Sequence, residues 1–240
     1  MDKREIEQIR YQLLFNKVSF SSKEMVLEVN SLDRAFIFNH DIVLLKYCSE
    51  AIKNDRNTVL ELVKINGNNI RLLKRAFKDD EEIVLAALKS RPNTFQYINK
   101  RFKENDEMVQ LVLEAEPKQI IHCLEKFKKD KEVVSKIIKS DFRLFEHVHP
   151  SLKNDLKLLN QIWEIIKEKH NHNQYTLSSQ TSWLIDNMGD RIRSKFSQVN
   201  FDSNLLSNQI DSYFSNIVLN RELNKELSNT KKIESKKLKI

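Results

Sequence analysis

Hydrophobic residues return along the middle of the chain with a period of 25 residues. The repeats can be counted from Asp or Asn residues that stand one period apart, which are Asp55, Asp80, Asn105, Asp130 and Asp155. If each of these is position 0, positions 3, 4, 7 and 8 are mostly apolar, as on one face of an amphipathic α-helix. Because Asp and Asn are favoured N-cap residues, the pattern predicts one capped helix in each repeat.

A second apolar stripe follows the first in each repeat. Position 12 is Gly67, Pro92 or Pro117 in three repeats, which predicts a turn. Apolar residues then return at positions 15, 18 and 22, and they predict a second short helix that ends just before the next cap. Since one such pair of helices cannot bury both stripes alone, we predict an all-α fold, an α-solenoid of about five helix-turn-helix repeats.

Composition supports an all-α, non-catalytic protein. The 240 residues include two Gly and three Pro, which disfavours a turn-rich β fold and the Gly-rich phosphate loops of nucleotide enzymes. Cys48 and Cys123 both stand at position 18, which favours buried packing over a redox role. The sequence has no G-x-S-x-G, Walker, H-E-x-x-H or C-x-x-C motif, and no carboxylate or Cys completes a metal set around its histidines. We therefore expect no enzyme activity, no cofactor and no metal.

The regions outside the repeats are predicted to differ from them. Residues 1–41 are expected to form an N-terminal helical cap, 42–169 the repeats, 170–181 a polar linker, 182–228 a C-terminal helical segment and 229–240 a basic disordered tail. The charged start and the short apolar runs predict neither a secretory signal nor a membrane span. A cytoplasmic protein is expected, or one exported into a host cell by a route that needs no signal peptide.

The repeats resemble a bacterial helical-repeat family of unknown function, the domain of unknown function 4116. The likeness covers about residues 42–163. The positions that carry it most fully are Asp80, Glu82, Val84, Leu85, Ala86, Ala87, Lys89, Gln96, Tyr97, Phe102, Lys103 and Asn105. The resemblance implies short stacked helices and no catalytic motif. It also implies an effector or inhibitor as one role, because these repeats recur in candidate secreted effectors of intracellular bacteria.

Lysine recurs at position 23, as Lys53, Lys78, Lys103, Lys128 and Lys153. Arg75, Lys100 and Arg101 lie on the same predicted helices. One interpretation is a basic stripe that contacts phosphates or an acidic partner. The other is local: a lysine in the last turn suits the helix dipole, and it precedes the next cap closely enough to pair with it. Formal charge is +4 over residues 55–104 and zero over 105–154, so the solenoid is not basic throughout.

Position 17 carries larger side chains that could pack or recognise a ligand. Its members are Tyr47, Leu72, Tyr97, His122 and His147. Stacked Tyr and His side chains at one repeat position predict either a half-buried packing ladder or a recognition surface. We include Tyr97, His122 and His147 among the candidate binding residues.

Three functions are compatible with this pattern. The leading hypothesis is a non-catalytic module that binds another protein with the side chains between its apolar positions. The alternative is a nucleic-acid-binding solenoid that uses the position-23 lysines and the basic tail. A third is an enzyme whose site lies in residues 164–230, where the repeat pattern has stopped. The sequence gives no indication of the oligomeric state.

Overall fold

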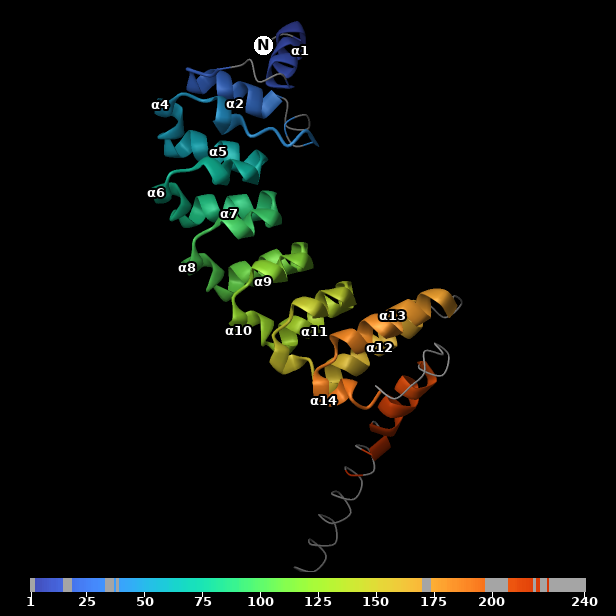
Figure 1. Ribbon diagram of the computed structural model, residues 1–240. Coiled ribbons are helices and arrows are strands. Elements are labelled where there is room, and N and C mark those ends of the chain that lie inside the picture. Colours follow the sequence, from blue (N-terminus) through green and yellow to red (C-terminus); the bar gives the residue numbers. More distant parts are fainter. Residues whose placement is uncertain are drawn as a thin grey trace, which may run out of the picture. The chain divides into compact units, whose positions relative to one another are not determined.

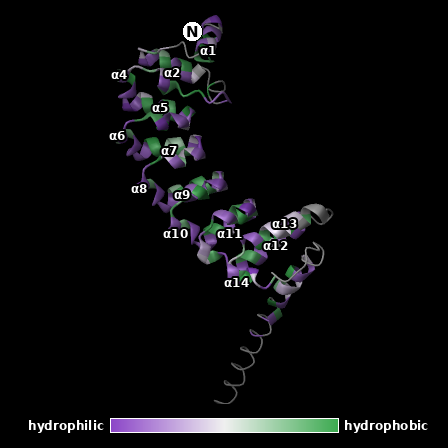
Figure 2. Ribbon diagram, in the orientation of Figure 1, coloured by the Kyte–Doolittle hydropathy of each residue, from purple (hydrophilic) through white to green (hydrophobic). Residues whose placement is uncertain are grey.

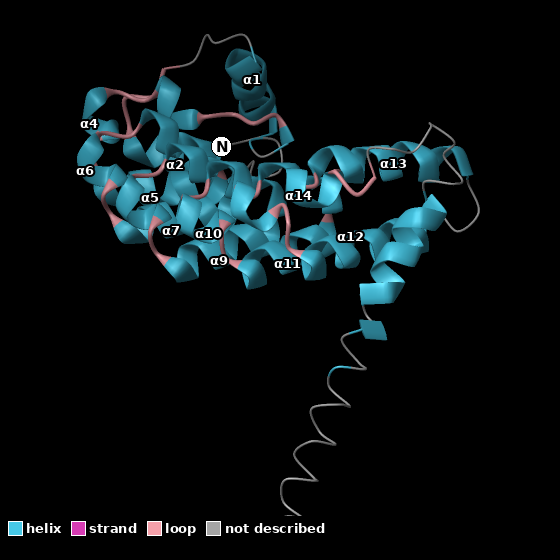
Figure 3. Ribbon diagram, turned by 60° about the horizontal axis from the view of Figure 1, so that its bottom comes forward, coloured by secondary structure: helices cyan, strands magenta, loops and turns pink. Residues whose placement is uncertain are grey.

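A computed structural model describes residues 3–14, 19–32, 37, 39–169, 174–196, 207–217, 219–220 and 224. The chain divides into two compact units, Met1–Leu124 and Glu125–Ile240. This boundary lies within the segment 42–169 that the sequence predicts as one array of repeats. Helices joined by short loops make up the described residues (Figure 3), apart from an isolated parallel bridge between Phe20 and Cys48. The all-α fold is therefore confirmed.

In the first unit, long helices lie side by side and short helices follow one edge (Figure 1). The long helices after α1 (Lys3–Leu14) are α2 (Lys23–Leu32), α5 (Arg56–Ile65), α7 (Glu81–Ser90) and α9 (Asp106–Ala115). The edge is formed by α4 (Glu50–Lys53), α6 (Arg75–Lys78) and α8 (Lys100–Lys103). The 3-10 helices pack against one another in chain order, and they are η1 (Leu44–Tyr47), η2 (Gly67–Leu72), η3 (Pro92–Tyr97) and η4 (Pro117–His122). Each long helix carries hydrophobic and hydrophilic residues (Figure 2), as its amphipathic pattern predicts.

The predicted N-caps are confirmed. At each position 0, a side-chain oxygen accepts a backbone N–H from the first turn of the following helix, at Asp55, Asp80, Asn105, Asp130 and Asp155. Each cap satisfies a donor that the helix itself leaves without an acceptor. The repeat pattern of the sequence thus fixes where the long helices begin.

The predicted second helix is divided in two. Positions 12–17 form a 3-10 helix and position 18 is extended. Positions 20–23 form a single turn of α-helix in the repeats that start at Asp55, Asp80 and Asn105, and positions 20–22 form a 3-10 turn in the repeat that starts at Asp130. At position 18, ψ lies between 148° and 160° at Leu73, Ile98, Cys123 and Val148. The reason lies in the spacing: apolar positions 15 and 18 are three residues apart, the period of a 3-10 helix, whereas position 22 follows four residues later.

The inward positions bury their side chains in both units. Position 15 is fully buried at Ile70, Phe95, Ile120 and Phe145. Cys48 and Cys123 are buried free thiols, as predicted from their shared position. Burial raises the pKa of the Cys48 thiol to about 11, so this cysteine is unreactive near neutral pH.

The second unit continues the repeat and then departs from it. Its elements are α10 (Glu125–Lys128), α11 (Lys131–Ser140), η5 (Phe142–His147), η6 (Pro150–Leu152), α12 (Leu156–Lys169), α13 (Gln174–Asn187) and α14 (Asp190–Arg193). The polar linker predicted over residues 170–181 is wrong from Gln174 onward, because α13 begins there and packs against α12. Thr181 is fully buried and donates to the carbonyl of Leu177, so polar residues are accommodated inside this helix.

Residues 207–217 are helical, and they lie within the C-terminal helical segment predicted over residues 182–228. They pack against α12, because Trp163 Nε1 donates to Asp211 Oδ1 at 3.1 Å and Ile210 and Phe214 are buried. The tail predicted over residues 229–240 lies outside the described residues. The C-terminal helical segment therefore contacts the last long helix that carries the repeat pattern.

Candidate partner-binding surface

The recurring lysine at position 23 binds within its own repeat. In the first unit, Lys78 Nζ donates to the carbonyl of Arg71 at 3.2 Å and Lys103 Nζ to that of Gln96 at 3.0 Å. In the second unit, Lys153 Nζ donates to the carbonyl of Phe145. All three acceptors lie near the end of the 3-10 helix of the same repeat, and the Phe145 carbonyl also accepts the backbone N–H of Val148. The lysine thus stabilises the end of that helix.

Two of these lysines also lie over a buried ring. Lys103 Nζ is 5.5 Å from the ring centroid of Phe95, and Lys153 Nζ is 4.5 Å from that of Phe145. Burial lowers the pKa of both ammonium groups, to about 8 for Lys153. Both ammonium groups are partly removed from water and directed at their own repeat, so they are less available for a phosphate contact than exposed lysines are.

The remaining two lysines of the column pair with acidic residues three positions earlier. Lys53 Nζ lies 3.1 Å from Glu50 Oε1, and Lys128 Nζ lies 3.4 Å from Glu125 Oε1. The local interpretation of the lysine column is therefore favoured, although the predicted partner, the next cap, is wrong.

Three of the caps pair with a cation at the first residue of the preceding long helix, and these caps are Asp55, Asp80 and Asp155. Arg56 at the start of α5 donates to both oxygens of Asp80, which caps α7, and its Nε–Oδ2 distance is 2.7 Å. In the second unit, Lys131 at the start of α11 lies 2.7 Å from Asp155, which caps α12. The Arg56 guanidinium holds the pKa of the Asp80 carboxyl below its usual value. These ion pairs join neighbouring repeats.

The other candidate cations lie on the outside of the short helices. The side chains of Arg75 on α6 and Lys100 on α8 are 94% and 77% exposed, and Arg101 follows Lys100 on α8. Arg75 and Arg101 both approach the Asp79 carboxylate, at 3.9 and 3.5 Å. Because exposed pairs contribute about 0–1 kcal/mol, these cations remain accessible to a ligand.

Exposed apolar side chains accompany these cations. Leu72 is 49% exposed and Tyr97 is 36% exposed, and both stand at position 17. The guanidinium of Arg71 lies 5.0 Å from the ring centroid of Tyr97, so η2 and η3 meet at this point. We define the edge patch as Arg71, Leu72, Arg75, Tyr97, Lys100 and Arg101.

The two candidate histidines lie in different units. His122 is half-buried at the end of η4 in the first unit. His147 ends η5 in the second unit, where its Nε2 lies 3.0 Å from Glu146 Oε1. Within the described residues, no group of three or more His, Cys, Asp or Glu side chains could hold a metal ion.

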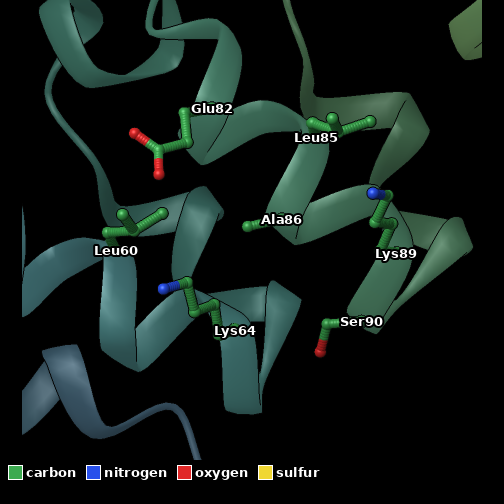
Figure 4. Close-up of a pocket in the computed structure, with 7 residues that line it drawn as sticks. All are labelled: Leu60, Lys64, Glu82, Leu85, Ala86, Lys89 and Ser90. Atoms are coloured by element: carbon green, nitrogen blue, oxygen red, sulfur yellow. The ribbon is translucent and has the colours of Figure 1, made fainter.

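Sequence analysis missed a groove on the outer side of the long helices. A hollow of about 350 Å³ lies between α5 and α7 (Figure 4). We call it the α5–α7 groove, and it is lined by Leu60, Lys64, Glu82, Leu85, Ala86, Lys89 and Ser90. Leu60, Leu85 and Ala86 stand at positions 5 and 6, outside the apolar stripe. Apolar residues at these positions were the available indication of a groove.

A second hollow lies between α2 and α5, on the preceding helix pair. It has a volume of about 490 Å³ and is lined by Leu27, Glu28, Asn30, Ser31 and Glu61. Asn30 is 4% exposed and its amide donates to the carbonyl of Glu61 at 3.1 Å. Its Oδ1 is buried and accepts no hydrogen bond from any described residue. The outer side of this unit is therefore hollowed over three successive long helices.

Among the described residues, no helix is both long and apolar enough to cross a bilayer.

Comparison with known proteins identifies the repeats. A model of the family described as domain of unknown function (DUF4116) matches residues 22–78, 55–103 and 80–123 in overlapping copies. The match begins before the predicted range of 42–163 and stops well before its end. No curated protein and no solved structure matches the chain. Residues 22–123 are therefore similar to the repeats of this family, whose description names no function.

Proposed function

We propose that the protein is a non-catalytic module that binds another protein through the α5–α7 groove. The observation that supports this most directly is the composition of the groove. Its floor is apolar, with Leu60, Leu85 and Ala86, and Lys64, Lys89 and Glu82 surround it. An apolar centre with a polar rim is the usual arrangement of a protein interface.

The extent of the surface favours a large ligand. The hollow between α2 and α5 adjoins the α5–α7 groove through their shared helix, α5. A ligand that fills both contacts three helices in succession, which suits the extended surfaces that repeat proteins present. A protein segment spans this length, whereas a small molecule occupies one enclosed pocket.

The hydroxyl in the groove is already engaged. Ser90 Oγ donates to the carbonyl of Ile65 at 3.2 Å and accepts the backbone N–H of Gly67 at 3.1 Å. The serine therefore ties α7 to the end of α5. This occupation supports a binding role for the groove over nucleophilic chemistry.

The nucleic-acid alternative relies on the position-23 lysines and the basic tail. The lysines at Lys78, Lys103 and Lys153 direct their ammonium groups to backbone carbonyls of their own repeats, which weakens the case for a phosphate stripe. The effector or inhibitor role that the family resemblance implies would consist of occupying a partner's surface. Cytoplasmic residence and export into a host cell both accommodate such a role.

A capture experiment with two matched variants tests the proposal. The full chain, Ala86→Glu and Lys136→Glu are used to capture partners from a cell lysate, with and without nuclease. Ala86 is half-buried in the groove, and Lys136 stands at the same repeat position on α11 in the second unit. We expect a stoichiometric protein partner that survives nuclease, is lost with Ala86→Glu and is retained with Lys136→Glu.

Two outcomes would overturn the proposal. Recovery of nucleic acid, with every protein partner lost after nuclease, would favour the alternative function. Retention of the partner by Ala86→Glu, with the variant folded by circular dichroism, would remove the groove from the interface.

A further inference from the structure

The edge patch is a second surface, formed by elements other than those of the α5–α7 groove. It lies on η2, α6, η3 and α8, whereas the groove lies on α5 and α7. Of the large hydrophobic side chains that are exposed in the described part of the chain, Leu72 and Tyr97 share one repeat position in consecutive repeats. Neighbouring apolar side chains of this kind mark a binding surface more strongly than scattered ones.

Charge is concentrated around these two side chains. Residues 71–79 and 96–104 together contain seven Lys or Arg and two Asp or Glu, a formal charge of +5. The equivalent residues carry +1 over 46–54, +2 over 121–129 and zero over 146–154. The charge therefore differs from repeat to repeat, and it is highest over residues 71–79, which carry +3.

The local ion pairs leave this charge largely uncompensated. Asp79 accepts from Asn99 and lies near both Arg75 and Arg101, so one carboxylate serves two guanidinium groups. Lys74 donates to the amide oxygen of Asn54 and also lies 3.7 Å from Glu50, whose side chain is 70% exposed. Arg75 and Lys100 are the most exposed of the cations that have acidic neighbours here. Carboxylates from a ligand would complete these pairs.

The apolar side chains of the edge patch favour an acidic peptide over a nucleic acid as the anionic ligand. The guanidinium of Arg71 already lies over the ring of Tyr97, which leaves less of its face for a stacking base. A phosphodiester backbone offers no apolar group for Leu72 to pack against, whereas a peptide can offer an apolar side chain. Tyr and Arg are also the residues that contribute most in protein interfaces.

We propose that the edge patch binds an acidic peptide segment that carries an apolar anchor residue. The anchor packs on Leu72 and Tyr97, and the flanking carboxylates pair with Arg75, Lys100 and Arg101. This site is independent of the groove, so the protein would present two separate binding surfaces on one unit.

Fluorescence anisotropy with a short labelled peptide of Glu and Asp around one Phe tests this proposal on the full chain. We expect binding to weaken about tenfold in Leu72→Ser/Tyr97→Ser and about tenfold in Arg75→Gln/Lys100→Gln. The matched pair Lys136→Gln/Lys139→Gln removes the same charge from exposed positions on α11, and we expect a change of less than about twofold. The groove variant Ala86→Glu should bind the peptide normally, which separates this test from that of the proposed function.

Three results would overturn the proposal. One is the absence of peptide binding. Another is equal affinity for a control peptide in which Ser replaces the Phe, because charge alone would then explain the binding. The third is tighter binding of a labelled poly-uridine oligonucleotide that displaces the peptide. Since Arg75 and Lys100 are highly exposed, their variant should fold even where the Leu72/Tyr97 variant does not.

Discussion

The edge of the first unit and the equivalent edge of the second unit share a framework, by which we mean the capping, buried and lysine positions that recur in the repeats. The two edges differ in the side chains that they expose. Lys103 in the first and Lys153 in the second each donate to a 3-10 carbonyl and lie over a buried phenylalanine ring. Outward from this framework, Tyr97 and Lys100 of the first unit correspond to His147 and Pro150 of the second. The residues that recur most regularly therefore maintain the fold. Function must then be sought where the repeats differ.

The same distinction applies to the lysine column as a whole. A row of lysines at one repeat position invites a phosphate-binding interpretation. In the structure, these lysines bind carbonyls or carboxylates of their own repeat. The cations that remain exposed, such as Arg75 and Lys100, stand at a position that is Glu125 in one repeat and Pro150 in another. Positions whose residues differ between repeats therefore indicate the binding surface better than positions whose residues recur.

The largest expected effect comes from breaking the framework in both units. Phe95→Ala and Phe145→Ala each remove a fully buried ring, and each should lower the free energy of unfolding by about 3–5 kcal/mol. Tyr97→Ala, at the outward position 17, should cost less than about 1 kcal/mol. Urea unfolding followed by circular dichroism measures all three.

Equal losses in the free energy of unfolding for Tyr97→Ala and Phe95→Ala would contradict this distinction between outward and buried positions. Position 17 would then belong to the framework, and the edge patch would lose its apolar anchor site. A small loss for Phe145→Ala alone would instead mean that the second unit does not depend on the repeat core.

An intermediate effect is expected at the caps, where the sequence provides its own control. Asp80→Ala removes the acceptor for the backbone N–H groups of Glu82 and Ile83 together with the partner of Arg56, and should cost about 1–2 kcal/mol. Asp80→Asn keeps the cap and should lose only the ion pair, about 0.5–1 kcal/mol. Asn105 shows that an amide caps the equivalent helix α9.

The ion pair also predicts a pH dependence for this variant. Because hydrogen bonds from Arg56 hold the pKa of Asp80 below its ordinary value of 3.8, the pair stabilises the folded state above that pH and is lost as the pH falls through the lower, folded-state pKa. The stability difference between the wild type and Asp80→Asn should therefore shrink on acidification. A constant difference from neutral pH to pH 2 would contradict the assignment of the cation partner.

The sequence predicted the framework because packing repeats. Caps at position 0, buried residues at position 15 and the equivalence of Cys48 and Cys123 all follow from one spacing, and all are confirmed. The split of the second helix was not predicted, because position 18 is buried whether the backbone there is helical or extended. The part of helix α13 from Gln174 to Thr181 was missed because Thr181 and its polar neighbours carry a weak amphipathic pattern.

The candidate surfaces were predicted only in part. Arg75, Lys100 and Tyr97 were identified from the sequence, but their exposure and the stacking of Arg71 on Tyr97 needed coordinates. The α5–α7 groove depends on the distance between helices, which a sequence pattern does not contain. Apolar residues at positions 5 and 6 indicate such a groove only when both neighbouring helices carry them.

The smallest expected effect separates the framework lysine from an ordinary surface lysine. Burial beside Phe145 lowers the pKa of Lys153 from 10.5 to about 8 in the folded protein, so between these values the unfolded chain binds more protons than the folded one. The stability of the wild type relative to Lys153→Met must then rise with pH over that window. The rise should be less than about 1 kcal/mol because the site is only half-buried. Lys103→Met should give the same sign in the first unit, where burial also lowers the lysine pKa. Melting temperatures measured from pH 7 to pH 10 test both. If the stability of the wild type relative to Lys153→Met instead fell as the pH rose, folding would raise the pKa of Lys153. The contact of Lys153 with the Phe145 ring would then not be what holds this lysine in the repeat.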